Sequence, residues 1–385
     1  MYFNMDNFIF LSVTSNYPIA FTAGNTKMEY MARGLNELGC CTLALNNWAS
    51  STNSDMDESG ISKEGIEYIT FNNEGNINII KNYKKTCRIL KERKSNNKSN
   101  IAILSTSRSH YMLLDIIAAR KCGYKTLFLF HEWRSALKMH SIFHKIDAWI
   151  KDHIIIRLFD AYLPISHYLL EKCNKVSNKK KKLIVPVLAD FSRTPQKSNI
   201  KERFTYCCGI WFIMRHPMLL DAMDFLVEKH PNSELMLILS GNKKDIALFS
   251  ENIKARKSAN NITIRTKVPF DELNDIYSCS LGLIIPLEPD SIADTARFSQ
   301  KIAEYIATGR PIITNAVGEI PYYFKNKESA YITEYSAEGF YKVMDEIIRE
   351  QDKATQIGNN GFEVGKTHFD YRKSSIDLVE FSINI

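Results

Sequence analysis

Short apolar runs alternate with amphipathic stretches along nearly the whole chain. In the first half the apolar runs are NFIFLSV (7–13), CTLALN (41–46), NIAILS (100–105), TLFLF (126–130), AYLPI (161–165) and LIVPV (183–187). In residues 25–38, Met28, Met31 and Leu35 recur at spacings of three and four, the period of one buried helix face. The stretch 110–123 reads as another helix that ends at Gly123, where a C-capping glycine belongs. Strands alternating with helices indicate βαβ units and parallel sheets.

The second half repeats this alternation after a polar segment. Strands are predicted at FTYCCGI (204–210), LMLILSG (235–241), NITIRT (261–266), LGLIIPL (281–287) and PIITNA (311–316), with helices between them. The segment from Pro195 to Arg203 is short and polar, and a domain boundary is expected there. We therefore predict an α/β chain of two Rossmann-like domains, residues 1–195 and 196–385, facing each other across a cleft. The final helix, after Tyr371, could cross back onto the first domain.

Composition narrows the class of protein. The chain has 385 residues, 45% hydrophobic and 24% charged, which is typical of a globular protein with two α/β domains. No apolar run approaches the roughly 20 residues that span a bilayer, and the start reads as a strand rather than a signal peptide. The eight cysteines form no paired CxxC motifs, so we expect buried free thiols, a reducing cytoplasm and no metal site.

The net charge of +7 is concentrated in mid-chain, from Lys145 through the run Lys179–Lys182 to Arg203. Such a patch can serve an anionic membrane surface, a phosphorylated ligand or nucleic acid, or it can be a solvated loop. No aromatic-rich RNA-binding signature accompanies it, so no nucleic acid partner is expected. The stretch from His144 mixes Trp149 and isoleucines with basic residues. It is either an amphipathic helix at an anionic membrane or a helix packed on its own domain.

The most informative segment is ARFSQKIAEYIATGRPIITNAVGEIPYYF, from Ala296 to Phe324. It reads as a loop after a strand, a helix that ends at Gly309, and a buried strand. Ligands of open α/β sheets bind beyond the carboxyl ends of the strands. Glu304 lies in this helix among apolar neighbours, and a buried carboxylate needs partners. The two hydroxyls of a ribose would suit it, but so would solvent, Lys301 or Arg310.

This segment resembles the donor-site block K-x-x-E-Y-x-A-x-G-x-P-[VI]-[VI] of glycosyltransferase family 4. The matching residues are Lys301, Glu304, Tyr305, Ala307, Gly309, Pro311 and Ile312. Further blocks in the same order, such as DAYLPISHYLLEK and NITIRTKVPFDELNDIYSCS, extend the resemblance over nearly the whole chain. It implies a GT-B fold and retaining transfer of a sugar from a nucleotide-diphosphate donor, with front-face attack and no bound metal or other cofactor.

The resemblance also assigns donor-side roles. Glu304 would hold the donor ribose, and Phe298, Ser299 and Lys301, in the form RFSQK, would belong to the same donor site. The first glutamate of the family's E-x7-E motif is replaced by Ala296, as in sub-groups with the form F-P-x-K-x-x-E-Y. This departure bears on which sugar is bound more than on the fold.

Two further donor-side positions follow strands. In CGIWFIMRHP, a glycine at a strand end before a helix start suits a phosphate, and a nearby cation would offset the charge of the leaving diphosphate. The family's form here is G-R-x-x-x-x-K; Gly209 matches, Ile210 replaces the arginine, and Arg215 replaces the lysine. Arg215 could instead merely cap the helix start. By the resemblance, backbone groups near Thr266 and Lys267 would meet the base.

The first half supplies the acceptor side. By the resemblance, Gly24 and Asn25 lie in the loop that borders the acceptor and the transferring sugar, although a glycine before a helix is commonly just a turn. His131 and Glu132 follow the strand TLFLF, at an end that should face the cleft. A histidine near the donor sugar is implied there, while a His–Glu pair could also cap the next helix.

The function predicted is therefore transfer of a sugar to a glycan or lipid-linked acceptor, of the kind used in bacterial cell-surface polysaccharide synthesis. Two alternatives remain open. One is a weakened GT-B partner subunit that binds a nucleotide sugar, suggested by Ala296 and Ile210. The other is a nucleotide-sugar epimerase of the same fold. The donor base, sugar and linkage are not encoded in these motifs.

Overall fold

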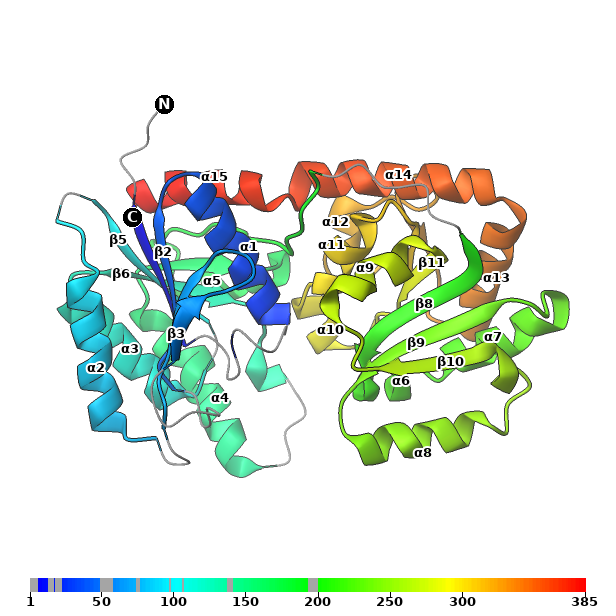
Figure 1. Cartoon of the computed structure of the whole chain (residues 1–385), viewed down its shortest axis with the longest axis horizontal. Coiled ribbons are helices and arrows are strands. Elements are labelled where there is room, and N and C mark those ends of the chain that lie inside the picture. Colours follow the sequence, from blue (N-terminus) through cyan, green and yellow to red (C-terminus); the bar gives the residue numbers. More distant parts are fainter. Residues whose placement is uncertain are drawn as a thin grey trace. The chain divides into compact units, whose positions relative to one another are not determined.

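The computed structural model describes residues 6–12, 17, 23–48, 58–73, 77–96, 98–105, 107–136, 141–192 and 200–385. The chain forms two compact units (Figure 1). The first unit draws on residues 1–188, 295–298 and 369–385, and the second on residues 189–294 and 299–368. The predicted domain boundary at residue 195 lies outside the described residues.

The first unit is built on a seven-stranded sheet, as far as the described residues show, in the order β3-β4-β2-β1-β5-β6-β7. All neighbouring strands are parallel except β3 and β4. The strands are β1 Asn7–Leu11, β2 Cys41–Asn46, β3 Glu58–Ile61, β4 Glu67–Thr70, β5 Asn100–Leu104, β6 Lys125–Phe130 and β7 Ala161–Pro164. The helices are α1 Ala23–Glu37, α2 Ile79–Glu92, α3 Ser109–Lys121, α4 Ile142–His153, α5 His167–Val176 and α15 Tyr371–Ile383, with 3-10 turns at Arg134–Ala136 and Ile155–Leu158.

Apolar strands explain this layout. Every residue of β1 and β5 is buried, as expected for a parallel sheet that helices cover on both faces. The predicted helix over residues 25–38 is α1, and its apolar stripe packs into the core of this unit. The predicted cap is confirmed as well, because Gly123 follows α3 with a φ of 84°, which favours glycine.

Two strand predictions in the first unit were incomplete or wrong. LIVPV is not a regular strand; Leu183 and Val185 donate backbone hydrogen bonds to β7 at 3.1 and 3.0 Å, but Pro164 of β7 has no N–H to return one to Leu183. Conversely, β3 and β4 were not predicted. Both are four residues long and carry few apolar side chains, so the alternation signal is weak.

The last helix, α15, belongs to the first unit and packs along α1 (Figure 1). Ser375 donates to the carbonyl of Met31 at 3.4 Å, and the ring of Tyr371 stacks on Tyr30. A Cβ added at Gly34 would lie 2.2 Å from Ser375 Oγ, so glycine is what allows this close helix contact. The C-terminal end of the chain thus completes the N-terminal unit.

The second unit has a six-stranded sheet of described strands, all parallel, in the order β10-β9-β8-β11-β12-β13. The strands are β8 Lys201–Gly209, β9 Glu234–Ser240, β10 Ile262–Thr266, β11 Ser280–Ile285, β12 Ile312–Thr314 and β13 Tyr331–Ile332. The helices are α6 Ile210–Arg215, α7 Met218–Lys229, α8 Lys243–Ile253, α9 Phe270–Ser278, α10 Ile292–Ala296, α11 Gln300–Ile306, α12 Ile320–Tyr323, α13 Ala337–Arg349 and α14 Gln351–His368, with a 3-10 turn at Ala259–Asn261.

The α/β prediction with two Rossmann-like domains is therefore confirmed. All eight cysteines are free, but only three are buried; Cys207 and Cys208 are half-buried and Cys41 is exposed. Among the described helices, none combines the length and the apolar character that a membrane crossing would require.

Candidate functional site

Polar side chains in the second unit gather where its strands end. Along this edge the carboxyl ends follow one another as Thr266 of β10, Ser240 of β9, Gly209 of β8, Ile285 of β11 and Thr314 of β12. Neighbouring strands lie about 4.8 Å apart, so roughly 10 Å separates the ends of β10 and β8. This is the edge at which open α/β sheets bind ligands.

Glu304 lies on α11 and forms an ion pair with Lys301 one turn earlier, with Nζ and Oε2 2.7 Å apart. The Glu304 side chain is only 10% exposed. The neighbouring Tyr305 is buried, and its hydroxyl accepts a hydrogen bond from the backbone N–H of Cys207 at 2.8 Å. Since Cys207 lies two residues before Gly209, α11 is held against the end of β8.

Electrostatics keeps Lys301 charged. Burial lowers the pKa of Lys301, but the nearby charge of Glu304 outweighs burial and raises it above its ordinary value. Lys301 takes one carboxylate oxygen of Glu304, while Oε1 has no partner in the described part of the chain. The Glu304 carboxylate therefore keeps one oxygen for a ligand hydroxyl. Its other oxygen pairs with Lys301, which was the alternative partner expected from the sequence.

Gly209 caps the start of α6, and Arg215 ends it. Ile210 is completely buried in the core of the second unit, so the position of the missing arginine has become a packing position. Just beyond β9, Gly241 has a φ of 137°, and a Cβ there would lie 2.6 Å from Ile210 Cγ2. Glycine at 241 lets the loop pass over Ile210.

Arg215 is anchored to the loop that follows β11. Its Nη2 donates to a carboxylate oxygen of Glu288 and lies 3.3 Å from Ser291 Oγ and 3.7 Å from Asp294 Oδ2. Burial lowers the pKa of Arg215, but the hydrogen bond to Glu288 and the charge of Asp294 outweigh burial and raise it. The cation predicted for the diphosphate is thus already paired with carboxylates.

The remaining residues predicted for the donor side lie on separate elements. Thr266 and Lys267 are exposed at the end of β10, and Lys267 has a φ of 54°. Ser299 precedes α11 without a side-chain cap bond. Phe298 belongs to the first unit, where its buried ring contacts Phe369 at a centroid distance of 5.4 Å. Within the second unit the structure therefore groups Gly209, Lys301 and Glu304, and holds Arg215 beside the end of β11.

Ala296, which replaces the family's first glutamate, is buried in the first unit. Its carbonyl accepts a hydrogen bond from Ser166 Oγ at 2.6 Å. Its side chain is therefore unavailable to any ligand.

In the first unit, Gly24 and Asn25 open α1, Gly24 half-buried and Asn25 buried. Lys27 follows one half-turn later and is only 1% exposed. Its ammonium donates to the carbonyl of Val185, with no carboxylate partner among the described residues. Burial holds the pKa of Lys27 well below its ordinary value.

His131 follows β6 at the same edge of the first sheet. Its Nε2 is buried without a hydrogen-bond partner in the described residues. Burial, together with the charge of Lys27, holds the pKa of His131 well below its ordinary value. A neutral imidazole of this kind can exchange hydrogen bonds with a sugar hydroxyl but supplies no charge. The predicted neighbour Glu132 is exposed.

Sequence reasoning missed Lys27 and the two carboxylates on Arg215. A signal for Lys27 existed, because it stands four residues before Met31 on the apolar stripe of α1, where a cation is out of place. No spacing signal exists for Glu288, which is 73 residues from Arg215.

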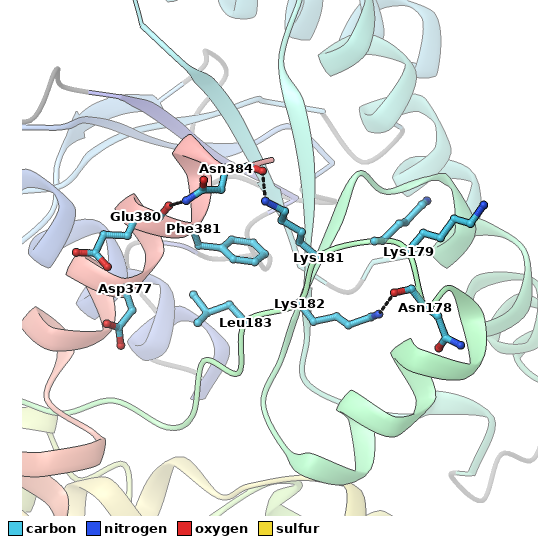
Figure 2. Close-up of a pocket in the computed structure, with 10 residues that line it drawn as sticks. Asn178, Lys179, Lys181, Lys182, Leu183, Asp377, Glu380, Phe381 and Asn384 are labelled. Carbon is cyan, nitrogen blue, oxygen red and sulfur yellow. Dashed lines mark hydrogen bonds between the residues drawn. The ribbon is translucent and has the colours of Figure 1, made fainter.

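The lysine run is tied to the chain's own backbone. Lys180 donates to the carbonyls of Arg157 and Phe159, Lys181 to that of Asn384, and Lys182 to that of Asn178 at 3.2 Å. Figure 2 shows this run across from α15, lining a pocket of about 670 Å³ with Asp377 and Glu380 on its other side. None of the predicted site residues lines this pocket, so the run has a structural role in addition to any it plays at a surface.

No group of three or more His, Cys, Asp or Glu side chains within the described ranges is placed to bind a metal ion.

Comparison with known proteins adds a family and a fold. Residues 202–350 match the family model described as "Glycosyl transferases group 1". Sucrose-phosphate synthase from Thermosynechococcus elongatus has a TM-score of 0.74 at 11% identity, covering 99% of this chain and 98% of that one. Anabaena HepE, solved with UDP and glucose, has a TM-score of 0.72 at 10% identity, covering 99% and 100%. A Rickettsia africae glycosyltransferase reaches 0.71 at 18%, covering 99% and 98%. No curated protein sequence matches the chain.

The fold is thus the GT-B fold, an α/β architecture with two parallel sheets. Through residues 202–350 the second unit is similar to group 1 glycosyl transferases, and the chain is an enzyme of glycosyl transfer.

We predict that Lys27 helps to keep His131 uncharged. In Lys27→Met the pKa of His131 should rise, because a nearby positive charge is gone, yet stay below its ordinary value because burial is the larger cause. Imidazole NMR titration, assigned with His131→Gln, measures this. Lys125→Met, at the opposite end of β6, is the matched control. An unchanged His131 pKa in Lys27→Met would contradict the coupling.

Proposed function

We propose that the protein transfers a sugar from a nucleotide-diphosphate donor, bound at the carboxyl edge of the second unit, to a glycan or lipid-linked acceptor bound on the first unit. The observation that carries this proposal is the Lys301–Glu304 pair, held against the end of β8 with one carboxylate oxygen unpaired, inside a group 1 glycosyl transferase domain. The reaction retains anomeric configuration by front-face attack, in the manner implied by the family 4 resemblance.

The donor proposed first is a UDP-sugar. Anabaena HepE, whose fold this chain shares, was solved with UDP-glucose. In the proposed complex the base lies near Thr266 and Lys267, the ribose hydroxyls meet Glu304, and the diphosphate meets Gly209, Arg215 and Lys301. The distance of roughly 10 Å between the ends of β10 and β8 suits a nucleoside laid along this edge.

In this proposal the protein accelerates the transfer by stabilising charge and by positioning the two substrates. As the glycosidic bond breaks, negative charge grows on the diphosphate, and cations stabilise that state more than the bound donor. The acceptor hydroxyl loses its proton to the departing phosphate, so no side-chain nucleophile and no metal are proposed. His131, kept neutral, orients a hydroxyl of the transferring sugar beside Gly24 and Asn25.

A sugar-transfer assay tests this function. Nucleotide release should appear with one donor of a panel only when an acceptor is added, with UDP-sugars tried first. Sugar isomerisation without release would instead indicate an epimerase, and donor binding without turnover would indicate a partner subunit. The buried Ile210 and Ala296 remove two groups that the family resemblance places at the donor, which is why the partner subunit is kept as the second candidate.

Glu304→Ala should weaken UDP binding by about 10- to 150-fold, since a hydrogen bond to a charged group contributes about 1.5–3 kcal/mol. Calorimetry with UDP and with its 2′,3′-dideoxy form measures this. Only UDP should lose affinity, because the dideoxy form lacks the hydroxyls that Glu304 binds.

Lys301→Met is the control for loss of the ion pair and should weaken both ligands alike. Equal UDP affinity in folded Glu304→Ala would remove Glu304 from the ribose site.

We also propose that α4 rests on the anionic inner face of a membrane, where a lipid-linked acceptor would be presented. Its exposed side chains include Phe143 at 79%, Ile142 at 61%, Trp149 at 53% and Ile146 at 50%. Its two acids point inward instead: Asp147 accepts from Ser109, and Asp152 accepts from Ser135. The outer face of α4 is therefore apolar and basic, with His144 and Lys145 exposed beside these side chains.

The double variant Phe143→Ser/Trp149→Ser should reduce binding to phosphatidylglycerol-containing vesicles about 10-fold or more, because two large apolar side chains no longer insert. Vesicle sedimentation at low and high salt measures this. Ile80→Ser, which removes an exposed isoleucine from α2, is the matched control and should bind as the unchanged protein does. Equal sedimentation of both variants would argue against α4 as the contact.

A further inference from the structure

The contacts of Arg215 leave two nitrogens of its guanidinium unused. Glu288, Ser291 and Asp294 all meet the same nitrogen, Nη2. Nε and Nη1 have no partner among the described residues, and the side chain is 40% exposed. A guanidinium N–H makes a charge-assisted hydrogen bond to a phosphate oxygen. Both two-nitrogen edges of the group include Nη2, so Nε and Nη1 would each donate to a phosphate separately.

The loop that provides these contacts is internally braced. Ser291 donates from its backbone N–H to the carbonyl of Glu288 at 3.1 Å, and Asp294 donates from its backbone N–H to Ser291 Oγ at 3.2 Å. Asp294, whose side chain is fully buried, accepts from the backbone N–H of Glu288 at 3.1 Å. Glu288 is therefore held at its backbone while its carboxylate reaches Arg215.

The brace continues along the strand ends. Leu287 donates to Asn315 Oδ1 at 2.9 Å, and Asn315 donates in turn to the carbonyl of Thr333 at 2.9 Å. On the other side, Tyr335 donates to the carbonyl of Arg215 at 3.3 Å. Both the main chain and the side chain of Arg215 are thus fixed to the ends of β11, β12 and β13.

We infer that Glu288 is a positioning residue for the transfer reaction, holding Arg215 by Nη2 so that its unpaired N–H groups meet the donor diphosphate. This inference rests on the proposed function. Ile210 stands where the family's motif has a second cation. The orientation of the Arg215 guanidinium therefore determines how strongly the negative charge on the departing diphosphate is stabilised. An exposed ion pair adds little to stability, so its value here lies in geometry.

Kinetics of Glu288→Ala tests the inference. The turnover number should fall about 10-fold with a smaller change in the KM for the donor, because the loss concerns orientation in the transition state. Glu288→Gln should recover much of it, since its amide oxygen still accepts from Nη2. Asp290→Ala, which removes an exposed carboxylate from the same loop, should behave as the unchanged protein. In an Arg215→Ala background, itself slower by about 100-fold or more, Glu288→Ala should add no further loss.

The outcomes separate the two claims. An unchanged protein that neither binds nor turns over any nucleotide sugar contradicts the proposed function, and this inference with it. Normal transfer by the unchanged protein, with equal turnover by Glu288→Ala, overturns the role of Glu288 alone. So does tighter donor binding at undiminished rate, which would mean that Glu288 competes with the diphosphate for Arg215. Loss that persists in the Arg215→Ala background would assign Glu288 to loop structure instead.

Discussion

A parallel sheet covered on both faces keeps the side chains of its strands away from water, so polar chemistry of the sheet lies beyond the strand ends. In the second unit all six residues of β11 are buried, and each neighbouring strand pairs in parallel, so side chains that need water or a ligand must appear where the strands end. Gly209, Glu288 and Asn315 all follow strand ends on one edge. The site is thus a consequence of how the sheet is buried, and the strand order determines which loops can share a ligand.

The same constraint governs the charges at this edge. A cation placed beside a buried sheet needs compensation, and here each cation comes with a carboxylate: Lys301 with Glu304, and Arg215 with Glu288 and Asp294. Compensation and binding do not conflict, because each pairing uses only part of its groups. Glu304 keeps one oxygen, and Arg215 keeps Nε and Nη1. The carboxylates lower the net positive charge at this edge, but they also hold the cations in a fixed orientation.

Periodicity along the chain predicted the fold well, and contacts between distant residues poorly. The helix over residues 25–38, the cap at Gly123 and the five strands of the second half all carry local signals, and all are present. LIVPV carried the same apolar signal and failed, because a strand also needs a neighbour that donates to it, and Pro164 of β7 cannot donate. For the site, the local motif placed Lys301 next to Glu304. No local pattern could link Arg215 to Glu288, which are joined only after β8 and β11 pair.

The two departures from the family's motifs have one physical explanation. Ile210 and Ala296 are both buried, at 0% and 2% exposure, and each takes part in packing or in a backbone hydrogen bond rather than in a ligand contact. A position that has joined the core cannot return to ligand binding by a single substitution, because a charged side chain there would be buried without a partner. The chemistry must therefore be met by side chains that remained at the edge. Among the described residues of the second unit's edge, Arg215 is the cation whose main chain and side chain are both held by neighbouring strand ends. In the proposed function, accurate placement of one cation then substitutes for a larger number of charges, since a fixed guanidinium needs no rearrangement when the diphosphate departs.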